Sequence, residues 1–187
     1  VCGDCHPGAH EDYTTSVHWG NGKPHAVCTD CHGLHGILPV ADQSSKAYRS
    51  IVCANCHPGP MEELQKGPHF QAFEQTQALL CASCHSNHAI QHPTIAGLEE
   101  ACIACHDPGS EAYALGQRVA VQFKSFHEKK AASHLVILSA SDSGLETKRA
   151  VQTLNAGSGQ FTQARLVWHS LNEQEIEKIA DQASSLA

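Results

Sequence analysis

The cysteines and histidines of this chain are the residues whose types and spacing could do chemistry. The 187 residues include 10 Cys and 15 His, so about one residue in seven has a side chain that binds borderline or soft metals. All ten cysteines fall into five pairs of the form C-x-x-C, and a histidine follows every pair. The pairs are Cys2 and Cys5, Cys28 and Cys31, Cys53 and Cys56, Cys81 and Cys84, and Cys102 and Cys105. The histidines that follow them are His6, His32, His57, His85 and His106.

The C-x-x-C-H order indicates covalent attachment of haem. Two thiols at this spacing can add to the two vinyl groups of one porphyrin, and the adjacent histidine then presents its imidazole to the iron. Five complete motifs therefore predict five haem c groups, with the ten cysteines as attachment points and the five motif histidines as iron ligands.

Other uses of paired cysteines fit this pattern less well. A disulfide framework would not require a histidine after every second cysteine, and a thioredoxin-like site uses one reactive pair within a βαβ pattern. Zinc is also bound by cysteine and histidine, and it is the more serious rival. Five copies of one C-C-H order would nevertheless be an unusual way to build tetrahedral zinc centres.

With these five motifs, which span residues 2–106, the chain resembles the multihaem c-type cytochromes. Haem is attached outside the cytoplasmic membrane in that family, so the resemblance implies an exported protein in the periplasm or outside the cell. It also implies a mainly α fold with extensive loops, packed around haem. The composition agrees, because aromatic residues make up only 5% of the chain, with 2 Trp and 1 Met, too few to fill a core of this size unaided.

An internal repeat indicates which histidines outside the motifs are candidate iron ligands. Residues 2–8 recur as residues 53–59, an offset of 51, and the second motif of each copy is followed by another histidine three residues later. Four histidines hold equivalent positions in the two copies: His18 and His69, and His35 and His88. In the family that the chain resembles, a second histidine usually completes each low-spin iron. We therefore expect these four to be distal ligands, without knowing which haem each one serves.

The fifth haem has two candidate distal ligands, His127 and His169. His127 follows the partial third copy of the repeat, and His169 lies on a predicted helix whose apolar positions include Phe161 and Ala164. Neither has a counterpart in the repeat. We expect the remaining histidines to bond haem propionates or solvent; they are His10, His25, His92 and His134.

The charge of the chain argues against anionic partners, and its hydropathy argues against a membrane span. Lys and Arg number 12 against 19 Asp and Glu, a net charge of -7, so we expect neither nucleic acid nor an anionic membrane surface as a partner. No apolar run approaches the roughly 20 residues of a membrane helix, so we expect no membrane span.

The haem motifs and the helical patterns divide the chain at residue 109. Residues 1–109 predict loops and single helical turns around haem, as two dihaem repeats at 2–52 and 53–101 and the start of a fifth site. Residues 110–187 predict helices that pack on the haems.

Within the second region we expect helical hairpins. A long apolar pattern from Leu115 to Leu138 predicts the first helix, a capping box over residues 143–146 starts the next, and glycines over 155–159 predict a break. A last helix should open near Ser170.

These features predict an electron-transfer protein rather than an enzyme. Two histidines on each iron leave no open position for a substrate, so the expected function is transfer of electrons along closely spaced haems between redox partners, such as a quinol-oxidising protein or other cytochromes. Self-assembly into a filament is a variant, because 15 histidines exceed the ten that five haems need. The alternative is a reductase of a nitrogen or sulfur oxyanion with one open haem.

Overall fold

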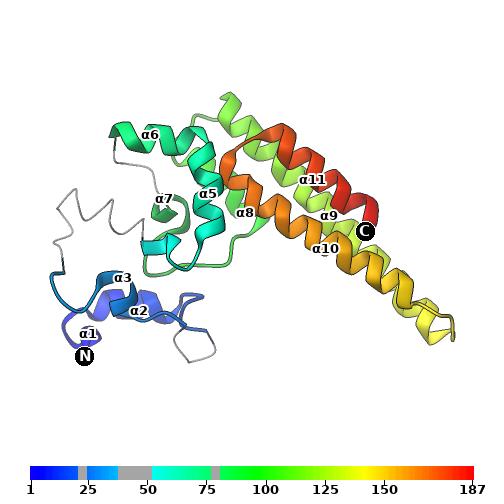
Figure 1. The fold of residues 1–187 in the computed structure, drawn as a ribbon, viewed down its shortest axis with the longest axis horizontal. Coiled ribbons are helices and arrows are strands. Elements are labelled where there is room, and N and C mark those ends of the chain that lie inside the picture. Colours follow the sequence, from blue (N-terminus) through cyan, green and yellow to red (C-terminus); the bar gives the residue numbers. More distant parts are fainter. Residues whose placement is uncertain (21–24, 38–51, 77–80) are drawn as a thin grey trace. The chain divides into compact units, whose positions relative to one another are not determined.

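The fold is built from helices. The computed structural model describes residues 1–20, 25–37, 52–76 and 81–187, and no strand occurs in these ranges (Figure 1). The expected mainly α class is therefore confirmed. The chain forms two compact units, Val1–Pro93 and Thr94–Ala187. None of the helices in the described ranges is long and apolar enough to cross a membrane.

The first unit consists of short helices. They are α1 (Cys2–Cys5), α2 (Pro7–Thr14), α3 (Cys28–His32), α5 (Pro58–Lys66), α6 (Pro68–Thr76) and α7 (Cys81–His85). Three of them begin with proline, which fits a first helical turn because it lacks only an N–H that would be unpaired there. His6 and His57, which precede two of these prolines, have nearly equal backbone angles of φ -122°, ψ 58° and φ -119°, ψ 58°. The sequence repeat is thus also a repeat of backbone conformation.

Two hydrogen bonds join distant parts of the first unit. The Val17 amide donates to the carbonyl oxygen of Ile90 at 2.8 Å. The side chain of Gln91 donates to the carbonyl oxygen of Thr15 at 2.9 Å. These bonds hold the segment after α2 beside the segment after α7.

The second unit contains longer helices whose starts are capped by side chains. Its elements are α8 (Ile95–Ile103), α9 (Glu111–Asp142), α10 (Lys148–Val167), the 3₁₀ turn η1 (Trp168–Ser170) and α11 (Glu173–Leu186). Thr94, Ser110 and Asn172 each accept a hydrogen bond from an amide three residues later, at 3.0, 3.2 and 3.2 Å. Such caps satisfy amides that have no partner within the helix, which is why α8, α9 and α11 begin where they do.

The core of the second unit lies between α9, α10 and α11, which run side by side (Figure 1). Phe126 stacks on Phe161 with ring centroids 4.1 Å apart, and Phe123 meets Phe161 edge-on at 4.9 Å. Ile176 and Ala183 of α11 close this cluster and are fully buried. Burying each phenylalanine contributes about 2–3 kcal/mol, so this apolar contact holds the three helices together.

Two sequence-based expectations about this unit are wrong. Residues 155–159 do not break the helix, since α10 runs through them. Gly157 instead lets α11 approach closely: a Cβ added there would lie 3.0 Å from the Ala183 carbonyl oxygen. The capping box expected at residues 143–146 is also absent, because Ser143 ends α9 and α10 starts after Thr147 without a side-chain cap.

The division into units differs from the expected boundary at residue 109. The observed boundary falls between Pro93 and Thr94, because α8 packs against α9. Helix α8 includes Cys102 of the fifth motif. The fifth motif thus belongs to the helical unit.

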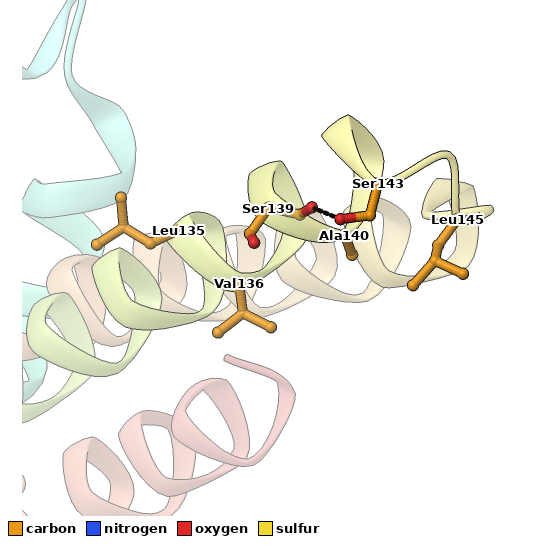
Figure 2. A pocket seen from close by; sticks show the side chains of 6 residues that line it. All are labelled: Leu135, Val136, Ser139, Ala140, Ser143 and Leu145. Carbon is orange, nitrogen blue, oxygen red and sulfur yellow. Dashed lines mark hydrogen bonds between the residues drawn. The ribbon is translucent and has the colours of Figure 1, made fainter.

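The hairpin of α9 and α10 extends past the end of α11 (Figure 1). Ser133 donates a hydrogen bond to the carbonyl oxygen of Ala187, and Val136 and Ile137, one turn further along α9, line a hollow together with Leu186 and Ala187. A second, shallow hollow lies near the tip, where Leu135, Val136 and Leu145 are about two-thirds exposed (Figure 2). The hairpin therefore carries exposed apolar side chains near its tip.

Candidate metal centres

Each C-x-x-C-H motif occupies about one helical turn. The second and fourth motifs are the helices α3 and α7. In the other three, the histidine amide donates to the carbonyl oxygen of the first cysteine at 2.9 Å: His6 to Cys2, His57 to Cys53 and His106 to Cys102. A helical turn places residues i and i+3 on one face. Both sulfurs of a pair therefore lie on the same side of the turn, as attachment to one porphyrin requires.

None of the ten cysteines, all of which lie in the described ranges, forms a disulfide, and within most pairs the two differ in exposure. The second cysteine of every motif is exposed. The first cysteine is half-buried in the second to fifth motifs and exposed in the first motif. In four motifs, therefore, the first cysteine is less exposed than the second.

Three motifs of the first unit converge through their cysteines. The Cys53 thiol hydrogen-bonds the Cys81 sulfur, which lowers the pKa of Cys81 to about 7 and, in the same contact, raises the pKa of Cys53. Although Cys31 is exposed as a residue, partial desolvation of its thiol raises its pKa, followed by electrostatic interaction with Cys53. The second, third and fourth motifs thus gather their attachment points close to one another.

His18, an expected distal ligand, lies beside the motif histidine His57. Their ring centroids are 6.3 Å apart and the ring planes differ by 27°. Burial, followed by the charges of His57 and His25, lowers the pKa of His18. The neutral imidazole, which is the form that binds metals, is therefore favoured at this position.

A second pair of the same kind is formed by His32 and His88. His32 belongs to the second motif, and His88 is another expected distal ligand. Their ring centroids are 6.0 Å apart with a 35° angle between the planes. Both side chains are half-buried.

The spacing of these two pairs fits one iron between two imidazoles. A metal–imidazole nitrogen bond is about 2 Å long and each nitrogen lies roughly 1 Å from its ring centroid, so two rings on opposite sides of one metal have centroids about 6 Å apart. The observed 6.3 and 6.0 Å agree with that separation. Two histidines for the iron and a pair of thiols for attachment to the porphyrin are the side chains that a haem c site uses.

Of the two candidates for the fifth distal ligand, His169 has the orientation of a metal ligand. It lies in η1, and its Nδ1 is 2.9 Å from the carbonyl oxygen of Leu166. A carbonyl only accepts hydrogen bonds, so Nδ1 is the donor in this contact. Histidine ligands are commonly fixed in this way by a backbone carbonyl.

His127 has a different environment, on α9 beside the aromatic core. Its ring meets Phe161 edge-on at 4.9 Å and Phe126 at 5.8 Å. Burial lowers its pKa first, followed by the charges of Lys130 and Arg165. His127 is nevertheless exposed overall, so these contacts place only one edge of its ring against the aromatic core. The feature that distinguishes the two candidates is the hydrogen bond of His169 to a backbone carbonyl.

The fifth motif has a close neighbour on α9. A Cβ added to Gly116 would lie 2.7 Å from the sulfur of Cys102. Burial raises the pKa of Cys102. Gly116 therefore gives this sulfur the space it occupies.

The other expected ligands are placed with less detail. His35 is exposed on the bend after α3, and His69 is half-buried near the start of α6. His85 and His106 are half-buried in or next to their motifs, whereas His6 is exposed between α1 and α2. In the described ranges no three His, Cys, Asp or Glu side chains cluster as a metal site. Ligation by all the expected histidines, these five included, stays a prediction.

Sequence reasoning missed three contributors to these sites. The thiol contact of Cys53 with Cys81 has no signal in the sequence, since 28 residues separate them. The Leu166 carbonyl is a backbone group, and Gly116 is one glycine inside a helical pattern. The only sequence signal for the Leu166 contact is that His169 follows Leu166 by three residues within a predicted helix.

No model of a known protein family, no curated protein and no solved structure matches this chain.

Proposed function

We propose that this chain is an exported pentahaem c-type cytochrome that transfers electrons along closely spaced haems between redox partner proteins. The observation that carries the proposal is the pairing of two motif histidines with two repeat-related histidines, at 6.3 and 6.0 Å between ring centroids. The five complete motifs support the number of haems. Export to the periplasm or beyond the cell follows from the resemblance to multihaem cytochromes.

The proposed mechanism assigns simple roles to the side chains. Bound haem would supply one-electron redox chemistry at each site. The cysteine pairs would hold the cofactor covalently, and the motif histidines would bind the iron. His18 and His88 would supply second iron ligands at two of the sites. His169, oriented by the Leu166 carbonyl, would do the same at the fifth site.

Close spacing of the haems is supported by the cysteines of the first unit. Cys53 and Cys81 are in hydrogen-bond contact, and the charge of Cys53 reaches Cys31. Cofactors attached at these sulfurs would be neighbours, and electrons pass readily only between near neighbours. The redox partners we propose are a quinol-oxidising protein or other cytochromes.

Haem content tests the proposal directly. Protein matured in a host with the haem-attachment machinery should carry five haems per chain, measured by intact mass and by a pyridine haemochrome assay. The double variant C81A/C84A should carry one haem fewer. A mature protein with no haem, or one that instead binds zinc at the motifs, would refute the proposal.

Spectra and turnover distinguish electron transfer from the reductase alternative. A protein with two histidines on every iron should be fully low-spin and should reduce nitrite, hydroxylamine or sulfite negligibly. Rapid turnover together with a high-spin ferric signal in the resting protein would favour the enzyme.

Filament assembly is a variant of the same proposal. Its support is the surplus of histidines, 15 against the ten that five haems need. Ordered rods in negative-stain images, with a histidine of a neighbouring copy on an iron, would support the variant. Particles of a single chain at all concentrations would exclude it.

A further inference from the structure

The two close histidine pairs each combine residues from different copies of the repeat. His18 comes from the first copy, and its neighbour His57 belongs to the first motif of the second copy. His88 comes from the second copy, and its neighbour His32 belongs to the second motif of the first copy. The exchange is therefore reciprocal.

The backbone joins the same two segments. Val17, next to His18, donates its amide hydrogen to the carbonyl oxygen of Ile90, two residues after His88, at 2.8 Å. Gln91 adds a bond to the Thr15 carbonyl oxygen at 2.9 Å. These bonds hold the segment that presents His18 against the segment that presents His88, independently of the ring positions.

We infer that the two dihaem copies exchange axial ligands: His18 completes the iron held at Cys53, Cys56 and His57, and His88 completes the iron held at Cys28, Cys31 and His32. This inference rests on the proposed function and adds which histidine serves which haem. Neither copy can then complete all its own irons, so the two copies form one unit that matures together.

The exchange can be tested by counting bis-histidine irons in double variants. A double variant that removes both ligands of one iron should lose one bis-histidine centre. A double variant that removes one ligand from each of two irons should lose two. The number of centres is measured from the integrated low-spin signal in electron paramagnetic resonance. This signal is compared with that of the same amount of unmodified protein, which is expected to hold five irons. The count does not depend on whether the altered site still retains its haem.

The exchange predicts specific counts. From five centres in the unmodified protein, His18→Ala, His57→Ala and the double variant H18A/H57A should all give four. The pair His88→Ala and His32→Ala should behave in the same way. The crossed variants H18A/H32A and H57A/H88A, made from the same substitutions, should give three.

The opposite pattern would overturn the exchange. If H18A/H57A gives three centres while the protein still binds five haems, His18 serves another iron and only this inference fails. If the unmodified protein binds no haem, the proposed function fails instead. A crystal structure of the unmodified holoprotein gives the same assignment without any variant, in case the double variants do not fold.

Discussion

Nδ1 of His169 donates a hydrogen bond to the carbonyl oxygen of Leu166, 2.9 Å away and three residues earlier in the chain. The bond fixes the tautomer and the ring orientation before any metal is bound, which lowers the entropic cost of ligation. His127, the other candidate for the same role, instead meets the ring of Phe161 edge-on. The two histidines therefore make different experimental predictions.

Replacing His169 with alanine should convert one haem from low to high spin, because one iron would lose its distal ligand. Visible and electron paramagnetic resonance spectra measure the change, and His127→Ala is the matched control that should leave the spectra as they are. Added imidazole should restore the low-spin signal of His169→Ala. A high-spin haem in His127→Ala, with none in His169→Ala, would reverse the assignment.

Gly116→Ala should disturb the fifth haem site. The new Cβ would lie 2.7 Å from the Cys102 sulfur, so the sulfur or α9 must shift, at a cost of about 1–3 kcal/mol for overpacking. We expect a fraction of the matured protein to lack one haem, measured by intact mass. Gly159→Ala is the control, because a Cβ added there would have no atom within 4 Å apart from the adjacent backbone of its own helix. This variant should keep the full haem content.

Gly157→Ala should destabilise the second unit, although alanine is the better helix former. Its Cβ would lie 3.0 Å from the Ala183 carbonyl oxygen and 3.1 Å from Cβ of Leu186, so α11 must move away. We expect a net loss of roughly 1–2 kcal/mol in the free energy of unfolding. Gly159→Ala, two residues further along α10, should instead gain up to about 1 kcal/mol. Equal effects of the two substitutions in chemical denaturation would contradict this packing.

The second unit should lose stability as the pH falls below neutral, in part through His127. Its pKa in the folded protein is lowered by burial, so below the unfolded value of 6.5 the unfolded chain binds more protons. The contribution of this group is complete above that value and is lost as the pH falls through the lowered pKa. His127→Gln should therefore flatten the dependence of melting temperature on pH between 7 and 5.

Arg165→Gln is the graded control for that experiment. The charge of Arg165 is one of the smaller causes of the lowered pKa of His127, after burial and Lys130. Its removal should weaken the pH dependence without abolishing it. An unchanged slope in His127→Gln would show that the pKa of this imidazole is the same in the folded and the unfolded protein, which contradicts the expected lowering.

The local features of the fold were predictable because short-range patterns specify them. The apolar positions from Leu115 to Leu138 predicted α9, and Asn172 with Ile176 and Ala183 marks the last helix. Each motif forms the single turn that its spacing indicates. The glycines near Gly157 misled the prediction, since their lack of a side chain serves contact with α11 rather than a turn.

The candidate centres were predictable only as a set of residues. The repeat identified His18 and His88 without showing their partners, because partner choice depends on contacts between segments 73 residues apart, such as the bond from Val17 to Ile90. Between His127 and His169 the sequence offered two helical histidines of equal standing. A backbone hydrogen bond distinguishes them, and backbone bonds of this kind leave no mark on residue types.

The hairpin of α9 and α10 carries its tip far from the fifth motif (Figure 1). From Gly116, beside the fifth motif, α9 continues to Asp142, which is about 40 Å at 1.5 Å per residue. Residues 131–141 contain no Asp, Glu, Lys or Arg, and Leu135 and Val136 are exposed there. Electron tunnelling fades over far shorter lengths, so the tip would lie out of electronic reach of the proposed fifth haem. A contact made at the tip would then leave the proposed electron transfer undisturbed.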